Sequence, residues 1–514
     1  MNPNYRVVPN TAGARRRYLT FESKATIGNQ HQLTLAAAAV PRQPTTSHSL
    51  ALLLAFLGFH VVLGLSMKEL PILATVHAWL SFIVALYWAA SEKAPGKVVL
   101  AVCYLAGAEV LWRMTGAAIL WEFGKYSVCA VLLVWVLRHF PRRVNGLALV
   151  YFGLLLPSTL LTIQAGLGLS QLRQVLSFNL SGPFSLALCT FCFYGLRLSY
   201  FEAAKALLAI LGPVIGAAAI CLSGTASLGA DYEFGDQSNF DTSGGFGPNQ
   251  VSSVLGLGML VVFLWMQRQQ RMSFRWWLAV ALILFFAAQA SLTFSRTGIW
   301  IGVLTIGVAS LFIIRRAGKG AIWLISALLI LASCYLALFG SLNTFTGGKL
   351  SDRYSEKMLL EKGFTGRGDI AEGDLLLALH NPLFGVGPGM ASFERSNHRG
   401  IAAHTEFTRL MAEHGLTGLL ALGAILMMAA SKLKAASSTW QQAWTASFIV
   451  YSLLFMMVTG MRLAVPSLAM GLAMARLTGA DAGDPNHRIQ AKRLGGGCYK
   501  QRTQTGTWLQ TNPE

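Results

Sequence analysis

Five ionisable side chains crowd the short segment that ends just before an apolar run: His404, Glu406, Arg409, Glu413 and His414. Histidine titrates near neutral pH, so His404 is a candidate general base for taking a proton from a hydroxyl group. Taken alone, a histidine of this kind is more often structural or solvent-facing. The spacing of Glu406, Arg409 and Glu413 favours ion pairs on one helix surface, which leaves Glu406 a supporting role at most. His414, at the edge of the apolar run, fits a structural role.

Three arginines elsewhere in the chain are candidates for binding an anion. Arg296, in "LTFSRTGIW", lies between two apolar runs and is flanked by hydroxyl residues, whereas Arg367, in "GRGD", lies between two glycines. A guanidinium group grips two oxygens of a phosphate or carboxylate at once. Arg296 equally fits an arginine that reaches the membrane surface, and Arg367 equally fits a solvated loop charge. Arg462, in "TGMRLAVP", is a further candidate.

Two other sequence features bear on the chemistry. Glycines 385, 387 and 389 predict a tight turn whose backbone amides either face an anion or serve the turn alone, and the second interpretation is favoured. The sequence has no Asp-x-Asp motif, no His-Glu-x-x-His motif and no spacing typical of an iron–sulfur or haem site. We therefore expect neither a metal nor a cofactor.

The composition indicates what kind of protein must position these residues. The chain has 514 residues, of which 54% are hydrophobic and only 12% are charged. A soluble domain has about 25% charged residues, so the sequence predicts a membrane protein. The formal net charge of +19 raises the question of a nucleic-acid partner. The basic residues lie in short clusters between apolar runs, however, so we expect no nucleic-acid binding.

Fourteen apolar runs approach the length that a helix needs to span a membrane, which is about 20 residues. They lie near 49–66, 70–90, 98–116, 122–137, 144–163, 182–195, 203–223, 250–266, 276–292, 298–314, 321–340, 415–430, 441–459 and 463–478. If the N-terminus is cytoplasmic, 27 of the 41 Lys and Arg residues fall on the cytoplasmic side and 14 on the other. The positive-inside rule supports this orientation.

The runs divide the chain into five parts. We expect a basic cytoplasmic tail at 1–48, a transmembrane bundle at 49–340, a large extracytoplasmic loop at 341–412, further transmembrane helices at 413–478 and a second basic cytoplasmic tail at 479–514. A long loop within a compact bundle usually carries function. The predicted fold is thus an all-α polytopic membrane protein with about 12–14 transmembrane helices and one large helical loop.

Three segments together resemble the O-antigen ligase and Wzy-type polysaccharide polymerase superfamily of bacterial membrane glycosyltransferases. They are "SRTGIW", then "GRGDI…LLLALHNPLFGVGPGMASF", then "AHTEFTRLMAEHGLTGLL". "GFGPNQVSSVLGLG" also resembles the family's Pro-Asn segment, which makes Asn249 a possible supporting residue. The resemblance covers about residues 245–425. Thr405 follows the histidine where the family often has Asn or Ser.

The resemblance implies a GT-C-like helical bundle in the bacterial inner membrane, with its active site on the periplasmic face. It implies a glycan donor carried on undecaprenyl pyrophosphate, an acceptor that is a glycan or lipid A-core, and a transfer that needs no metal ion. Arg296 and Arg367 would bind the pyrophosphate, and His404 would act at the acceptor hydroxyl. Ligase and polymerase both remain open. A polytopic transporter or flippase of glycans or small anions is the alternative from another class.

Overall fold

The computed structural model describes residues 46–92, 95–140, 143–229, 231–235, 237–316, 318, 320–355, 367–396 and 398–478. All of the second predicted tail, and all but the last residues of the first, lie outside these ranges. The long helices are α1 (Thr46–Glu69), α2 (Pro71–Ser91), α3 (Pro95–Met114), α4 (Phe123–Arg138), α7 (Leu169–Phe193), α8 (Tyr200–Ala226), α9 (Pro248–Met266), α10 (Phe274–Leu292), α11 (Arg296–Arg316), α12 (Gly320–Phe345), α17 (Glu406–Lys434) and α18 (Thr439–Thr459).

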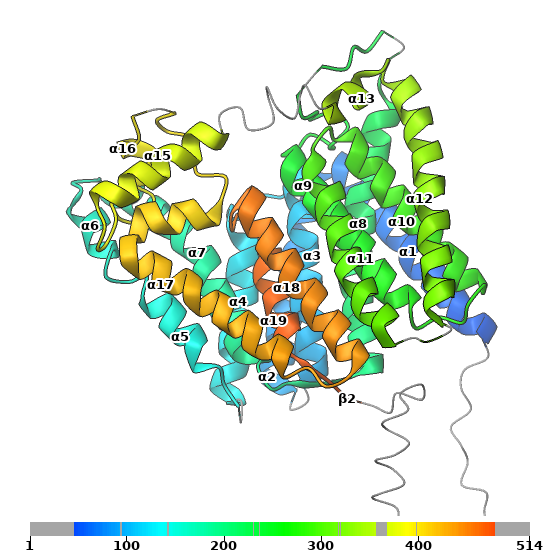
Figure 1. The fold of residues 1–514 in the computed structure, drawn as a ribbon, viewed down its shortest axis with the longest axis horizontal. Coiled ribbons are helices and arrows are strands. Elements are labelled where there is room, and N and C mark those ends of the chain that lie inside the picture. The colour runs from blue at the N-terminus through cyan, green and yellow to red at the C-terminus, as the bar shows by residue number, and fades with distance from the viewer. Residues whose placement is uncertain are drawn as a thin grey trace, which may run out of the picture. The chain divides into compact units, whose positions relative to one another are not determined.

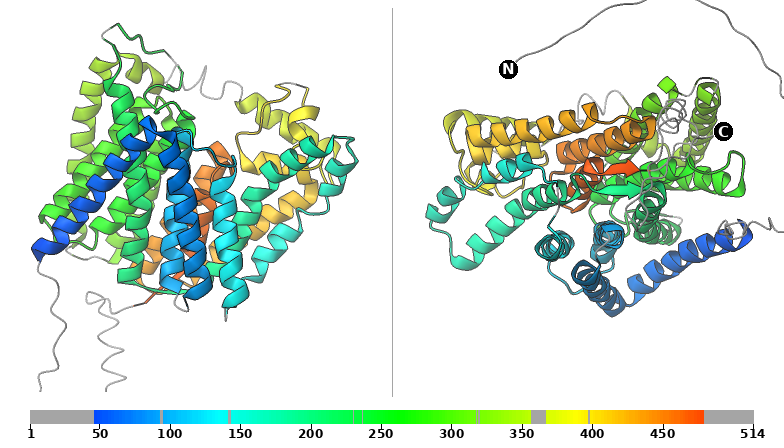
Figure 2. Two further views of the ribbon diagram at one scale, coloured as in Figure 1. Left: turned by 180° about the vertical axis from the view of Figure 1, so that it is seen from behind. Right: turned by 90° about the horizontal axis from the view of Figure 1, so that it is seen from below.

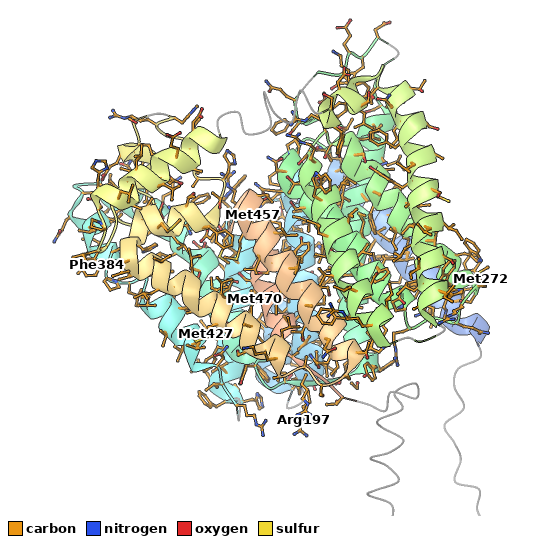
Figure 3. The ribbon with its side chains drawn as sticks, in the orientation of Figure 1. Arg197, Met272, Phe384, Met427, Met457 and Met470 are labelled. Carbon is orange, nitrogen blue, oxygen red and sulfur yellow. The ribbon has the colours of Figure 1, made fainter. Side chains whose placement is uncertain are left out.

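Shorter elements complete the described chain. They are α5 (Gly146–Gly153), α6 (Thr159–Gln164), α13 (Lys349–Tyr354), α15 (Arg367–His380), α16 (Ala391–Glu394) and α19 (Val465–Met474). The two strands, β1 (Arg197–Ser199) and β2 (Arg476–Thr478), pair in parallel with Arg197 opposite Arg476. Arg197 lies at the lower end of the helices in Figure 3. This strand pair ties the end of α19 to the start of α8.

Eleven helices in the described part of the chain are long and apolar enough to cross a membrane. The chain is therefore an all-α polytopic membrane protein, as the sequence predicts. Apolar side chains such as Met427 and Met457 are exposed on the outside of these helices, whereas Met470 of α19 is fully buried. Outward-facing apolar groups suit a surface that contacts lipid.

Three of the fourteen predicted runs do not form helices of spanning length, so the described residues contain eleven candidate spans where the sequence predicts 12–14. The run at 122–137 forms α4, which has 16 residues. The run at 144–163 is divided into α5 and α6, because Pro157 lacks the backbone N–H that a continuous helix needs. The run at 463–478 forms only the ten residues of α19 before the chain extends into β2.

Small residues let the central helices approach each other closely, as is common in membrane bundles. Helix α9 packs against α8, α10, α11 and α18, and α12 lies at the edge of the bundle (Figure 1). Where α9 crosses α11, a Cβ atom added at Gly298 would overlap the Ser252 carbonyl oxygen, and one at Gly256 would lie 2.5 Å from the Gly298 carbonyl oxygen. The start of α11, which carries Arg296, is thus fixed against α9.

The predicted loop at 341–412 is largely helical where it is described. Helix α12 continues to Phe345, and α13, α15 and α16 follow before α17 begins. Helices α15 and α16 lie against the first turns of α17, beside α6 and the start of α7, in both views of Figure 2. A small hydrophobic cluster of Val386, Met390, Ala391 and Ala412 holds this group together, separately from the main core.

Gly298→Ala is expected to lower stability, because the added methyl group meets backbone rather than a movable side chain. Overpacking of this kind costs about 1–3 kcal/mol. The measurement is the thermal unfolding midpoint of the protein purified in detergent. Gly307→Ala in the same helix is the control, since no atom lies within 4 Å of its added Cβ. Equal midpoints for the two variants would contradict the close packing of α9 and α11.

Candidate functional site

A cleft lined by both charged and apolar residues lies where the start of α17 meets α7 and the loop between α18 and α19. It encloses about 330 Å³, including its open mouth. The lining residues come from three separate stretches of the chain: Phe178, Asn179, Ala402, Ala403, Glu406, Arg409, Gly460, Met461 and Arg462. Glu406 and Arg462, both singled out as supporting residues in the sequence, are therefore brought together.

One wall of the cleft is a buried ion cluster centred on Arg409. Its Nε donates to Glu406 Oε2 at 3.0 Å, its Nη1 donates to Glu413 Oε2 at 2.8 Å, and all three residues are buried. Nη1 also donates to Asn179 Oδ1 at 3.2 Å, while Asn179 Nδ2 donates to the Val175 carbonyl oxygen at 2.8 Å. The spacing predicted these ion pairs. Their burial and their link to α7 could not be read from the spacing.

His404 lies at the edge of this cleft, just before α17. It is partly exposed, and its neighbours Ala403 and Glu406 line the cleft. Thr405 caps the helix, because its hydroxyl accepts a hydrogen bond from the Phe407 amide at 3.3 Å. Arg462 Nη2 donates to the Ala403 carbonyl oxygen at 3.2 Å. Arg462 thus contacts the backbone that carries His404.

Charged residues of α3 fix the loop that carries Arg462. The Ala464 amide donates to Glu109 Oε2 at 2.6 Å, and Arg113 Nη2 donates to Glu109 Oε1 at 2.6 Å and to the Arg462 carbonyl oxygen at 3.4 Å. Arg113 also stacks 4.7 Å from the centre of the Trp121 ring. Glu109 and Arg113, four residues apart on α3, form a buried ion pair, and the pair also holds the loop.

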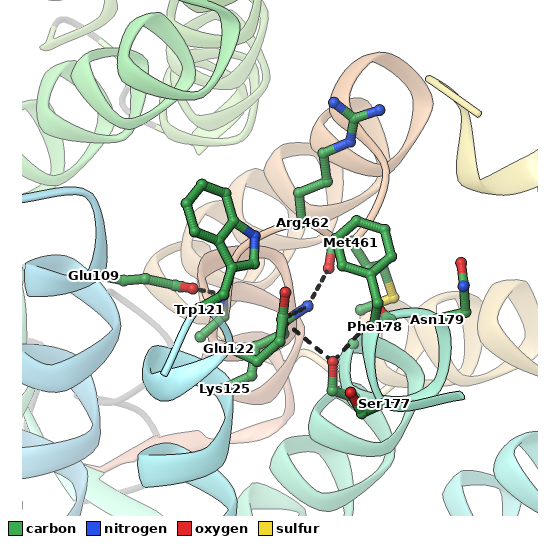
Figure 4. A network of polar contacts seen from close by, with 12 residues as sticks. Glu109, Trp121, Glu122, Lys125, Ser177, Phe178, Asn179, Met461 and Arg462 are labelled. Atoms are coloured by element: carbon green, nitrogen blue, oxygen red, sulfur yellow. Dashed lines mark hydrogen bonds and ion pairs between the residues drawn. The ribbon is translucent and has the colours of Figure 1, made fainter. Parts of the chain in front are cut away.

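A second buried ion pair supports the same loop from α4 (Figure 4). Lys125 pairs with Glu122 and donates to the Met461 carbonyl oxygen at 3.1 Å. Ser181 of α7 donates to Glu122 Oε2 at 3.3 Å. The Arg462 side chain points away from these residues (Figure 4). The sequence analysis did not single out Glu122 and Lys125. The sequence feature that could have identified this pair is two opposite charges, three residues apart, at the edge of an apolar run.

Arg296 is the first residue of α11 and is not among the residues that line the cleft. Its Nη1 is buried and has no hydrogen-bond partner among the described residues. Beside it, Ser295 Oγ donates to Asn249 Oδ1 at 2.7 Å, which gives Asn249 a role in ordering this helix start. A buried N–H group without a partner is costly, and an anion's oxygen would satisfy it.

Helix α13 brings a second cation close to Arg296. Arg353 Nε donates to the Phe294 carbonyl oxygen at 3.0 Å. Burial raises the pKa of the Tyr354 phenol, and the positive charges of Arg296 and Arg353 oppose this shift. Arg367 begins α15, but its side chain lies outside the described part of the structure. Whether Arg367 faces Arg296 therefore stays a prediction.

The glycine turn is structural. The Val386 amide donates to the Ala412 carbonyl oxygen at 3.0 Å, and the Gly387 amide donates to the Glu413 carbonyl oxygen at 2.9 Å. These carbonyls lie just before Gly415, where a φ of 57° and a ψ of −133° kink α17. The interpretation of the turn as an anion site is thus not supported at these two amides, because they serve the kink.

His414 is fully buried beside this kink. Its Nδ1 pairs with the hydroxyl of Ser158, from the segment between α5 and α6. This position fits the structural role expected from the sequence. Within the described residues, no three histidine, cysteine or acidic side chains are grouped so that they could hold a metal ion.

The fold and the cleft define a class: a multi-pass membrane protein with a helical segment packed over a cleft that holds buried charges beside its bundle. Residues 290–423 match the family model described as O-antigen ligase, which confirms for this segment the predicted resemblance to the O-antigen ligase and Wzy-type superfamily. Arg296, Arg367 and His404 lie within the matched segment, whereas Asn179 and Arg462 lie outside it. No curated protein matches the chain.

Gly415→Ala is expected to destabilise the site strongly. A side chain at a positive φ is strained, at roughly 1–3 kcal/mol, and the added Cβ would lie 2.7 Å from both the Gly385 nitrogen and the Pro382 carbonyl oxygen. The measurement is protein abundance in the membrane together with the thermal unfolding midpoint. Gly423→Ala, in the same helix with no atom within 4 Å of its Cβ, is the control. The kink is dispensable if Gly415→Ala matches this control.

Proposed function

We propose that this protein is a membrane glycosyltransferase of the O-antigen ligase or polymerase type. It transfers a glycan from undecaprenyl pyrophosphate to a sugar hydroxyl during surface polysaccharide biosynthesis. The observation that carries the proposal is the family match over residues 290–423, which includes Arg296, Arg367 and His404. The reaction takes place on the extracytoplasmic face of the inner membrane, where the positive-inside rule puts the loop at 341–412.

The donor half of the reaction needs positive charge at the leaving group. Departure of the pyrophosphate breaks the bond to the anomeric carbon and leaves negative charge on the phosphate oxygens. Arg296 and Arg367 stabilise this charge, because guanidinium groups stay protonated and grip two oxygens at once. Support comes from Arg296, whose Nη1 is buried without a partner, and from the nearby cation of Arg353. This chemistry needs no metal ion.

The acceptor half needs a base next to a place for a sugar. His404 takes the proton from the acceptor hydroxyl as the oxygen attacks the anomeric carbon. The adjacent cleft is lined by paired charges, carbonyl oxygens, an amide and the Phe178 ring. The Glu406 carboxylate lines the cleft and pairs with Arg409, and a carboxylate in the lining suits an uncharged glycan acceptor better than a pyrophosphate. The acceptor is a glycan in a polymerase and lipid A-core in a ligase.

A transporter or flippase of glycans or small anions is the second candidate. The observation that favours it is the ten-residue helix α19, which follows a loop held by buried charged residues. Transporters often bind their substrate at such interrupted helices.

Deletion of the gene tests the proposed function. Surface polysaccharide from the deletion strain is separated by size and examined for attachment to lipid. Single-repeat products indicate a polymerase, and long unattached chains indicate a ligase. Unchanged surface polysaccharide would overturn both. Accumulation of lipid-linked glycan on the cytoplasmic side of the membrane would favour a flippase instead.

Arg296→Lys and Arg367→Lys are each expected to lose most transfer activity. An ammonium group cannot reproduce the fork that binds two oxygens of a phosphate. The assay measures transfer from lipid-linked glycan extracted from membranes, normalised to protein abundance, which should stay near that of the wild type. If both variants transfer glycan at close to the wild-type rate, the two arginines do not form a pyrophosphate clamp.

His404→Ala is expected to reduce the transfer rate by a factor of roughly one hundred to ten thousand, which is typical of losing a general base. Binding of undecaprenyl pyrophosphate should persist. His380→Ala is the matched control, because His380 is exposed at the end of α15. Should His404→Ala retain most of its turnover, His404 is structural and the base is a different group.

A further inference from the structure

Arg395 is a buried arginine that neither the sequence analysis nor the proposed reaction uses. It follows α16, and its side chain is fully buried. Its aliphatic part packs on α15, where a Cβ atom added at Gly373 would lie 3.1 Å from Arg395 Cδ. Glycine at position 373 therefore makes room for this side chain. A charge buried this deeply must be paired.

The partners of Arg395 join three elements. Its Nε lies 3.2 Å from Asp374 Oδ1 of α15 and donates to the Ala391 carbonyl oxygen of α16 at 3.1 Å. Asp374 Oδ2 accepts a hydrogen bond from Thr408 Oγ1 of α17 at 3.0 Å. Burial raises the pKa of Asp374, whereas the positive charge of Arg395 opposes this shift. The buried pair thus connects α15 and α16 to the first turn of α17.

The same guanidinium group holds the backbone just before His404. Arg395 Nη2 donates to the Ile401 carbonyl oxygen. Arg462 Nη2 donates to the next two carbonyl oxygens, at 3.4 Å for Ala402 and 3.2 Å for Ala403. Two arginines therefore hold three consecutive carbonyl groups. One arginine precedes this segment in the sequence, and the other follows it. His404 is the next residue.

We propose that Arg395 is a positioning residue that holds His404 where it can take the proton from the acceptor hydroxyl. Arg395 does so through its hydrogen bond to the Ile401 carbonyl group. Asp374 anchors the guanidinium group to α15 and, through its hydrogen bond with Thr408, to α17. The inference rests on the proposed function, because it assigns to His404 the step that Arg395 supports. Lysine cannot replace arginine here, since one ammonium group cannot contact Asp374, Ala391 and Ile401 in the same geometry. A shift of about 1 Å in a reacting group can lower a rate roughly a hundredfold.

Arg395→Lys tests the proposal, because it keeps the positive charge beside Asp374 and removes the fork. We expect the turnover rate to fall about ten- to a hundredfold, with the KM for lipid-linked glycan unchanged. Arg399→Lys is the matched control. Arg399 is exposed, and its Nε donates to the Arg395 carbonyl oxygen at 3.2 Å. Among the described residues, no hydrogen bond joins the Arg399 side chain to residues 401–403. Its turnover rate should stay at the wild-type value.

Two measurements separate positioning from loss of fold. The first is the stoichiometry with which undecaprenyl pyrophosphate binds the purified protein. Full stoichiometry with slow turnover supports the proposal. Reduced stoichiometry with normal turnover per bound molecule means that Arg395 only stabilises the fold, which overturns it. If Arg395→Lys does not accumulate, Thr408→Val removes one anchor of Asp374 and should give a smaller loss of turnover at full stoichiometry.

The second measurement is a double-mutant cycle with His404→Ala. If Arg395 acts through His404, adding Arg395→Lys to His404→Ala lowers the residual rate no further. An equal fold-loss in both backgrounds would overturn the inference while leaving the proposed function intact. The proposed function fails separately, if the wild-type protein transfers no glycan and deletion of its gene leaves surface polysaccharide unchanged.

Discussion

The candidate site depends on the burial of one guanidinium group between two carboxylates. Taking Arg409 out of water costs several kcal/mol, and only close pairing with Glu406 and Glu413 offsets that loss. The two carboxylates lie on the same helix, so without Arg409 they would repel each other in a low-dielectric environment. Because Arg409 also donates to Asn179, the cluster fixes the start of α17 against α7. The cluster therefore fixes the two walls of the cleft that α17 and α7 provide.

The kink at Gly415 determines where that cluster lies. The residues before the kink form a separate helical segment from those that continue as the span (Figure 1). The carbonyl groups that lose their helical partners at the kink accept hydrogen bonds from the 385–387 turn. The turn and the kink therefore require each other, since glycine is needed at both positions 385 and 415. A polar cluster can in this way be built on a helix that also enters the membrane.

The sequence predicted the class of fold, the helical loop and the residues around His404, because apolar run length and charge distribution are local properties. Long runs such as 203–223 and 250–266 appear as α8 and α9 with small changes at their ends. The run at 144–163 is predicted wrongly as one span, since hydropathy alone does not register the break at Pro157.

The contacts of Arg409 with Asn179 and of Arg395 with Ile401 could not be foreseen. Only tertiary packing brings Arg409 and Asn179 together. Arg395 and Ile401 are separated by a turn whose geometry the sequence does not reveal. Arg462 was identified from its residue type and its place between two apolar runs, and its contact with the backbone before His404 is a long-range consequence of the α18–α19 loop.

That loop also bears on the choice between a transferase and a transporter. In a transporter with an interrupted helix, the free amide groups at the start of the half-helix face an anionic substrate. In this protein the Ala464 amide, at the start of α19, already donates to the Glu109 carboxylate at 2.6 Å. Lys125 and the Nη2 atom of Arg113 likewise donate to carbonyl groups of the same loop. A substrate anion would have to displace a buried carboxylate that is itself paired with Arg113. The interruption is thus filled by the protein's own charges, and its effect is to hold Arg462 against the backbone that precedes His404. This arrangement favours a site at the cleft, where a transferase needs it, over one inside the bundle.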